Sequence, residues 1–296
     1  LTAKGNSLDI TDGFAHLKIK DLDLADHQIS SFENITYTKK SGGDSIHVNI
    51  PKLEWVPDIN AIIDGKVMAD DIRINSPVIH IDVTQKNEIE TIKKISLWPE
   101  TKIGKLIIEH PNLEFTKKSD RGTAKINWKG TDNVFELEDL NISKHPQTHF
   151  TAGKIRLSLH HFLYSSAKGR TFDAGDGQLN VLLSKVELEQ NEANEWDWKA
   201  IISKLEAKKF VIDSLGKQAG KLAINSARLS DFSVVSSSLL NLRELITNNT
   251  KFKLDELTGS YYNNKNQFNW YNTGYDKNTR FFSADSFSYR PTQDKR

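Results

Sequence analysis

The sequence predicts a mainly β protein: an elongated, twisted antiparallel sheet that forms a groove, with several short helices between repeated strand units. Three observations support this prediction. Apolar and polar residues alternate cleanly in many short segments, a pattern returns after 34 residues, and hydrophobic residues make up only 37% of the 296-residue chain. Alternation is typical of strands with one apolar face, and a repeat of this length is typical of stacked units.

The stretch from Ile46 to Val83 shows the alternation most clearly. Residues 46–50 alternate, and Pro51 lacks a backbone donor, so we expect that strand to end there or to lie at an edge. Residues 58–63 predict a short helix that Gly65 stops. Alternation then resumes and continues after Pro77. The expected order is strand, short helix, strand, turn and strand.

The same pattern recurs when Pro77 is aligned with Pro111. The alignment pairs Ile72 with Leu106, Ile74 with Ile108, Ile79 with Leu113, and Ile81 with Phe115. Short helices are expected before the strands of each unit, at 58–63, 88–97, 161–166, 196–205 and 238–246. Because each unit would stack on its neighbours, the expected shape is long rather than round.

Local patterns predict further details. Trp198, Ile201, Ile202 and Leu205 have the i, i+3, i+4, i+7 spacing of an amphipathic helix. Apolar positions change phase between Ile19 and Leu22, which requires a bulge or a new strand near Asp21. Residues 41–44 and 129–133 are each expected to form a hairpin loop.

Composition narrows the possible functions. No linker rich in Pro, Gly or Ser divides the chain, so residues 1–296 are expected to form one elongated unit. A net charge of +1 from interspersed charges gives no electrostatic reason to expect a nucleic acid partner. No apolar run reaches the ~18 residues of a membrane helix. Because the chain begins at Leu1, we expect a fragment of a longer protein whose membrane anchor lies upstream.

The sequence offers no recognisable catalytic chemistry. The nine histidines are scattered, and no metal-binding spacing, phosphate-binding loop or nucleophile motif is present. His47 and His80 occupy outward strand positions, where solvated side chains are expected. Residues 173–178 resemble a calcium loop but lack its closing acidic residue, so a turn is the better interpretation. We therefore expect no enzyme, no catalytic or metal site, and no cofactor.

The segment from residue 14 to 115 resembles the N-terminal module of the AsmA-like proteins of Gram-negative envelopes. The resemblance lies in a short helix and small loop followed by apolar residues spaced around one proline. The matching positions are Met68 or Ala69, Ile72, Ile74, Pro77, Ile79 and Ile81, and again Ile103, Leu106, Ile108, Pro111, Leu113 and Phe115. The resemblance implies an AsmA-like module at 1–120 and further strand and short-helix repeats at 121–296.

The resemblance also implies a function. AsmA-like proteins have a β-groove and are implicated in phospholipid transport or outer-membrane assembly. We therefore expect a periplasmic protein, attached to the inner membrane in its full-length form, whose partners are lipid acyl chains or phospholipid and envelope proteins.

The groove is expected to be lined by alternating apolar residues, which are Val48, Ile50, Ile72, Ile74, Ile79, Ile81, Leu106, Ile108, Leu113, Phe115, Ile155, Leu157, Val181 and Leu183. One alternative is a structural or adhesive β-repeat scaffold with a packed interior that binds other envelope proteins. Another is a carbohydrate-active enzyme, which would need two carboxylates in a polar cleft.

Overall fold

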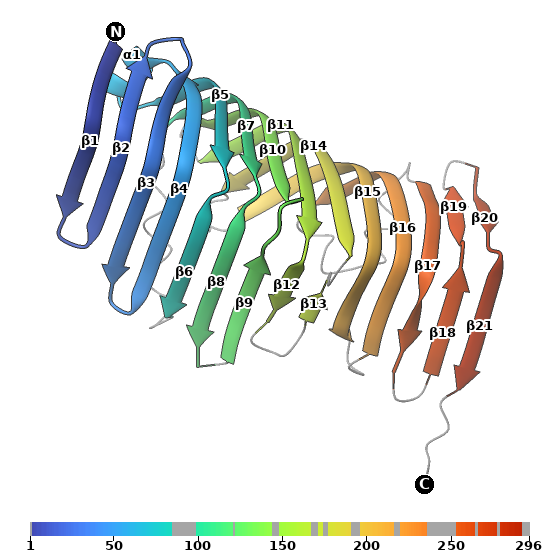
Figure 1. The fold of residues 1–296 in the computed structure, drawn as a ribbon. Helices are drawn as coiled ribbons and strands as arrows, with labels where there is room; N and C mark the ends of the chain where they lie inside the picture. The colour runs from blue at the N-terminus through green and yellow to red at the C-terminus, as the bar shows by residue number, and fades with distance from the viewer. Residues whose placement is uncertain are drawn as a thin grey trace.

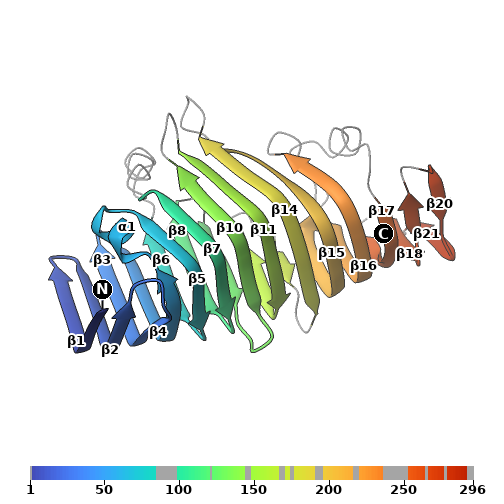
Figure 2. The same cartoon turned by 90° about the horizontal axis from the view of Figure 1, so that it is seen from above.

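The computed structural model shows a long stack of strands with the two chain termini at opposite ends (Figures 1 and 2). It describes residues 2–84, 99–120, 122–143, 148–166, 171–173, 177–190, 196–215, 220–235, 253–263, 266–276 and 279–291. All the strands in these ranges belong to one hydrogen-bonded sheet. The prediction of a mainly β protein is confirmed.

The sheet begins with four long strands and one short helix, which are β1 (Thr2–Asp12), β2 (Ala15–Ala25), β3 (Ser30–Ser41), β4 (Asp44–Pro57) and α1 (Ile59–Ile63). The middle of the sheet has an upper and a lower arm in the view of Figure 1. The upper arm contains β5 (Val67–Asn75), β7 (Thr101–Glu109), β10 (Val134–Ser143), β11 (His149–His160) and β14 (Gln178–Gln190). The lower arm contains β6 (Val78–Thr84), β8 (Asn112–Ser119), β9 (Gly122–Trp128), β12 (Phe162–Ser165) and β13 (Thr171–Asp173).

The remaining strands complete the sheet towards the C-terminus. They are β15 (Trp196–Leu215), β16 (Gly220–Val235), β17 (Lys253–Tyr262), β18 (Asn266–Tyr271), β19 (Gly274–Asp276), β20 (Phe281–Ser283) and β21 (Ser286–Pro291). The long strand β15 pairs with β14 of the upper arm and with β13 of the lower arm. At the other end of the arms, β4 likewise pairs with both β5 and β6.

These double pairings make the strands of the middle region a closed ring, which passes along the upper arm from β4 to β15 and returns along the lower arm. Strands β1–β3 and β16–β21 extend the ring at its two ends. The expectation of a simple open groove was therefore wrong in its topology, because single-sequence alternation does not show that one long strand can pair with two shorter ones.

The 34-residue repeat corresponds to two pairs of neighbouring parallel strands. In the register of β5 with β7, Ile72 lies beside Leu106 and Ile74 beside Ile108. In the register of β6 with β8, Ile79 lies beside Leu113 and Ile81 beside Phe115. The aligned residues are thus spatial neighbours, as the repeat predicts. The prediction of a wholly antiparallel sheet was wrong at these two pairings.

A line of backbone kinks separates the two arms. Asp21, Asn34, Ser76, His110 and His161 all have positive φ, near 50°. Asp21 lies between Lys20 and Leu22 within β2, where the register with β3 shifts, so the bulge predicted near this residue is confirmed. Lys20 and Asp21 are both exposed, whereas Ile19 and Leu22 on either side are not. Each kink therefore changes the phase of alternation and keeps apolar side chains on one face in both arms.

Only the first predicted helix is present in the described residues. Asp58 caps α1 by accepting a hydrogen bond from Ala61 N, and Gly65 follows with a φ of 76°. Residues 161–166 and 196–205 were wrongly predicted as helices, since they lie in β12 and β15. The helices expected at 88–97 and 238–246 fall outside the described residues. No described helix is long and apolar enough to cross a membrane.

The helical spacing around Trp198 has a physical explanation. In β15, the pairing with β14 skips Ser203, because Leu183 pairs with Ile202 and Leu182 pairs with Lys204. This bulge adds one residue to a strand whose inner positions otherwise recur every second residue. The extra residue turns alternation into an i, i+4, i+7 spacing, which imitates a helix.

Two local predictions about strand ends were also wrong. β4 continues through Pro51 to Pro57, because Pro51 lies at the kink, where the partner of β4 changes from β6 to β5. Residues 129–133 do not close a hairpin, since β9 pairs with β8 and β12 while β10 pairs with β7 and β11. The loop at 41–44 does close the β3–β4 hairpin, as predicted.

Candidate functional site

Apolar side chains form continuous rows on one face of the sheet, here called the inner face. Residues paired across neighbouring strands point to the same face, so the registers define each row. The first upper row runs through Leu22, Phe32, Leu53, Ile74, Ile108, Phe135, Leu157, Val181, Leu205, Leu229, Leu254, Tyr275 and Phe282. The second upper row runs through Trp55, Ile72, Leu106, Leu137, Ile155, Leu183, Ile202 and Phe232.

The lower arm carries matching rows. The first lower row runs through Ile46, Ile81, Phe115, Ile126, Tyr164, Phe172, Ile212, Leu222, Tyr261, Phe268 and Tyr289. The second lower row runs through Val48, Ile79, Leu113, Trp128 and Phe162. At about 4.8 Å for each strand, the first lower row is roughly 50 Å long.

The structure brings all fourteen predicted lining residues together on the inner face. Ile81 and Phe115 lie in the first lower row, and Val48, Ile79 and Leu113 lie in the second. Ile74, Ile108, Leu157 and Val181 lie in the first upper row, and Ile72, Leu106, Ile155 and Leu183 lie in the second. Ile50 lies beside the kink and pairs with the buried Ile35.

Sequence reasoning missed about two-thirds of the residues in these rows. Ile126, Phe172 and Phe268 are inner-face residues that were not proposed as lining. Their signal was present, since each alternates with polar residues in a short strand. It was weaker than at 46–83 because the strands are short or because their apolar residues, as in β18, are aromatic.

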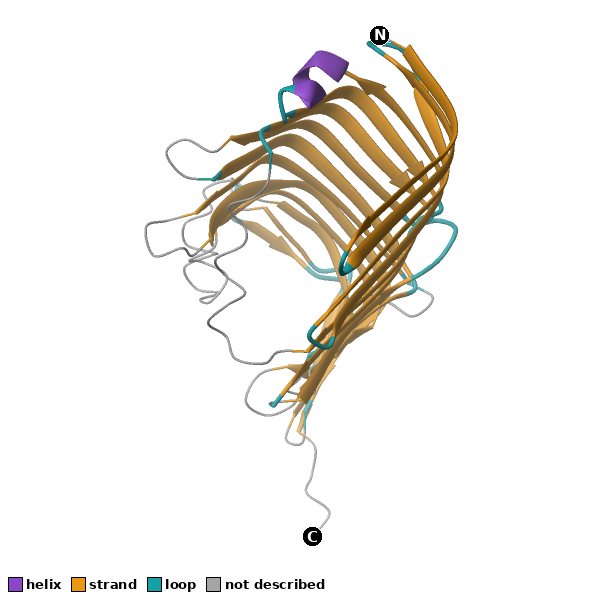
Figure 3. Ribbon diagram, turned by 90° about the vertical axis from the view of Figure 1, so that its left-hand side faces the viewer, coloured by secondary structure: helices purple, strands orange, loops and turns teal. Residues whose placement is uncertain are grey.

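The inner face is concave. Within the described residues, no second sheet and no helix other than α1 is available to cover it. Leu137 is nevertheless only 3% exposed, and Ala152 and Val186 are also buried. A single layer can bury side chains this well only if it curls towards them and crowds them together. Figure 3 shows this curvature of the sheet.

The rows differ in how deeply they are buried. Leu137 belongs to a packed cluster in the upper arm together with Ile103, Leu140, Ile142, Ala152, Val186 and Ala200, all of which are buried. The first upper row and both lower rows are half-buried along most of their length, with Tyr164 at 37% exposure. The half-buried rows are the part of the inner face that another molecule can reach.

The opposite, outer face carries cross-strand ion pairs. Lys105 Nζ lies 2.7 Å from Glu136 Oε1, and Arg156 approaches the other oxygen of the same carboxylate at 3.9 Å. Farther along, Arg228 bridges Glu206 and Glu256. His47 and His80, predicted to point outward, stack their rings on this face, and His80 Nδ1 lies 2.9 Å from Glu114. Charged and apolar side chains are thus segregated to opposite faces.

The Lys105–Glu136 pair predicts an acid-dependent loss of stability. The hydrogen bond from Lys105 lowers the pKa of Glu136, although partial burial opposes this effect. A folded-state pKa below the unfolded value of about 4.3 gives a stabilisation that is complete above that pH and is lost as pH falls through the folded pKa. We expect Glu136→Gln to flatten the acid limb of melting temperature against pH. Exposed Glu109, which makes no ion pair within the described residues, supplies the control Glu109→Gln, and an equal flattening there would contradict the assignment.

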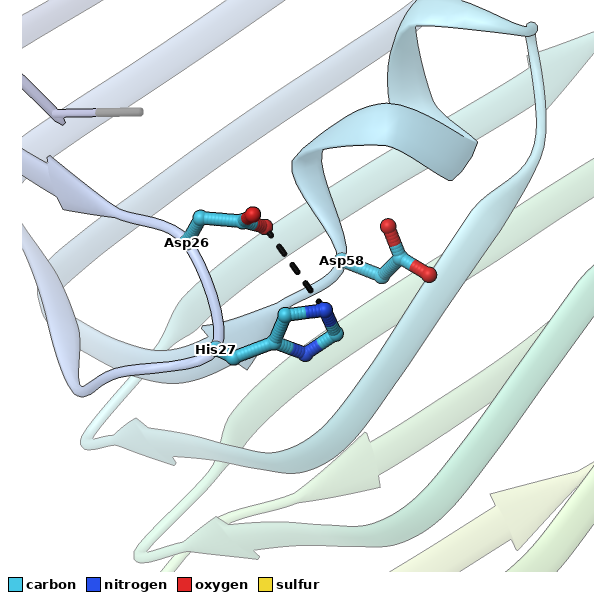
Figure 4. A group of neighbouring side chains, drawn as sticks. All are labelled: Asp26, His27 and Asp58. Atoms are coloured by element: carbon cyan, nitrogen blue, oxygen red, sulfur yellow. Dashed lines mark ion pairs between the residues drawn. The ribbon is translucent and has the colours of Figure 1, made fainter.

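Asp26, His27 and Asp58 form the only group of possible metal ligands within the described residues (Figure 4). Both carboxylates already have partners. Asp26 Oδ1 accepts a hydrogen bond of 2.9 Å from Ile59 N, and Asp58 Oδ1 accepts one of 3.0 Å from Ala61 N. The His27 ring is exposed and lies 4.0 Å from Asp26. These contacts are accounted for by the start of α1, which both aspartates cap.

The fold and the inner face define a protein with a long, curved sheet that closes into a ring in its middle and carries a continuous apolar inner face. Neither a scan against models of known protein families nor a search of curated proteins found a match for this chain. Its resemblance to the AsmA-like family thus rests on the residues quoted above.

Proposed function

We propose that this chain is an AsmA-like protein that holds lipid acyl chains against its apolar inner face and takes part in phospholipid transport or outer-membrane assembly. The observation that carries the proposal is the set of half-buried apolar rows, which cross the sheet from β2 to β21 without a described layer above them. Apolar surface that stays partly exposed over so many strands is unfavourable in water and is typical of a site for an apolar ligand.

The half-buried rows suggest where the chains lie. An acyl chain placed along the first lower row would contact side chains such as Phe115 and Tyr164, and it would remove them from water. The packed cluster around Leu137 has no comparable room, because its side chains already bury one another. The lower arm and the first upper row are therefore the proposed path of the lipid.

The proposal includes a cellular setting that comes from the family resemblance. The chain would act in the periplasm, close to the inner membrane, with phospholipid as its ligand and other envelope proteins as partners. It has no catalytic part in this proposal, since moving an acyl chain along an apolar face breaks no covalent bond. The charged outer face is suited to the aqueous side of such a protein.

The test compares two neighbouring residues of β12 that have nearly equal exposure. Tyr164, at 37%, lies on the inner face, and Leu163, at 39%, lies on the outer face. We expect Tyr164→Asp to reduce phospholipid copurified from membranes several-fold, because a carboxylate in contact with acyl chains would be desolvated without a partner. Mass spectrometry of organic extracts measures the lipid bound per protein.

Leu163→Asp is the matched control and should retain the lipid content of the unchanged protein. Both variants should melt near the parent temperature, since both positions are more than one-third exposed. Protein that carries no lipid, or equal lipid loss in the two variants, would contradict the proposal.

One observation favours a second function. The residues Ile103, Leu137 and Leu140 and their neighbours are as buried as those of a protein core. A structural or adhesive scaffold for envelope proteins would need such burial along its whole length. A scaffold would yield no lipid in the same extraction and would lose partner binding through variants of its outer face.

A further inference from the structure

The C-terminal edge of the sheet has backbone groups without partners in the described residues. β21 pairs with β18 on one side and β20 pairs with β19, but neither has a described strand on its other side. Every described residue from 279 to 291 is exposed. An edge of this kind presents free N–H and C=O groups to an incoming strand.

The side chains on this edge continue the apolar rows. Phe287 pairs with Trp270, and Tyr289 pairs with Phe268 and stacks on it at 4.9 Å between ring centres. Phe287 is 65% exposed and Tyr289 is 53% exposed, whereas Trp270 and Phe268 are half-buried. The difference arises because β18 has a paired strand on each side, β17 and β21, whereas β21 has a described strand on one side only.

The opposite edge of the sheet is protected against pairing. β1 carries Lys4, Asp9 and Asp12 together with Gly5, and Lys4 is paired with Asp23. Charges and glycine on an edge strand discourage strand addition. β21 is less protected, since its only charged residue is Arg290, its one proline, Pro291, stands at its end, and its inner side chains are aromatic.

Arg290 indicates the chemistry of the missing strand. On the outer face, basic residues such as Lys105 and Arg228 pair with a carboxylate on the neighbouring strand. Arg290 has no ion pair within the described residues. By the same pattern, the strand beside it would supply an acidic side chain to the outer face.

We propose that the β20–β21 edge binds a β-strand of a partner protein, with apolar residues towards the inner face and an acidic residue opposite Arg290. Hydrogen bonds to the backbone groups of β21 give affinity. The apolar contacts on the inner face and the ion pair with Arg290 on the outer face give selectivity. This surface does not depend on lipid binding, because the contacts are backbone hydrogen bonds and edge side chains.

The test uses two synthetic strand peptides that alternate valine and threonine, one with a glutamate and one with a lysine at the outward position. We expect the glutamate peptide to bind the full chain more tightly and to slow amide exchange within residues 281–291. Arg290→Glu should reverse the preference by about fivefold, as expected for cross-strand charge pairs. Fluorescence anisotropy of labelled peptides measures both affinities.

A second pair of variants separates edge binding from general stickiness. Phe287→Lys places a charge among the inner-face contacts and should weaken the glutamate peptide by about tenfold. Phe14→Lys is the control, because Phe14 is also exposed, at 73%, but lies in the turn between β1 and β2 at the other end of the sheet. Equal weakening by both variants, or exchange protection at β1 instead, would overturn the proposal. If the chain self-associates and Phe287→Lys abolishes this self-association, the strand that binds the edge belongs to a second copy of the chain, and the proposal of a different partner protein is wrong.

Discussion

Asn133→Ala is expected to lower the free energy of unfolding by about 1 to 3 kcal/mol, because its buried side chain joins the start of β10 to the end of β11 at the kink between the arms. Asn133 is fully buried and directly precedes β10. Its side-chain Oδ1 accepts a 2.6 Å hydrogen bond from His160 N at the end of β11, and its backbone oxygen accepts one of 2.9 Å from His110 N, between β7 and β8.

The alanine variant keeps the backbone hydrogen bond to His110 but leaves the half-buried His160 amide without its acceptor, which costs more than the hydrogen bond itself contributes. Urea unfolding measures the loss, and faster amide exchange at His160 would locate it. The neighbouring exposed residue gives the control Asp132→Ala, for which we expect little change. Equal stability of the two variants would mean that the backbone alone holds the kink.

The sequence predicted the inner face because apolar spacing reports directly on burial. The 34-residue alignment brought Ile72 to Leu106 and Ile79 to Leu113, and the structure has these residues side by side in parallel strands. A repeat of apolar residues fixes which side chains share a face, whether the neighbouring strands run parallel or antiparallel. The direction of pairing depends on the path of the chain between repeats, which spacing does not encode.

Irregular backbone explains most of the other differences. Ser203 adds one residue to β15 and gives a strand the spacing of a helix. Pro51 falls where β4 changes partners, so the proline usually taken as a strand end is tolerated within a strand. Both features depend on which distant strand lies alongside, and that is decided by the whole fold rather than by neighbouring residues.

The shared face of the proposed lining residues follows from the same spacing. All fourteen proposed lining residues lie on the inner face, but the sequence did not separate packed positions from accessible ones. Ile155 belongs beside the buried cluster, whereas Phe115 lies in a half-buried row. The curvature of the sheet decides which positions are packed, because it brings the side chains of the upper arm into contact. The curvature follows from kinks and bulges, which the alternation of apolar and polar residues does not reveal.

Gly104→Ala is expected to destabilise the sheet by about 2 to 4 kcal/mol because a methyl group there meets backbone rather than side chain. A Cβ at Gly104 would lie 2.6 Å from the carbonyl oxygen of Asp70 on the parallel neighbour β5. The adjacent pair, Ala69 and Ile103, is buried, so neither strand can move away without opening the packed part of the upper arm. Thermal unfolding of the purified chain measures the change.

Gly153 in β11 provides a close comparison for this substitution. It is exposed, as Gly104 is, and its added Cβ would lie 2.8 Å from a carboxylate oxygen of Asp139. A carboxylate on a flexible side chain can rotate away at small cost, whereas a ladder carbonyl is held by the sheet. Gly153→Ala should therefore cost less than Gly104→Ala by at least about 1 kcal/mol. The reverse order would show that the β5–β7 pairing yields more easily than its packing implies.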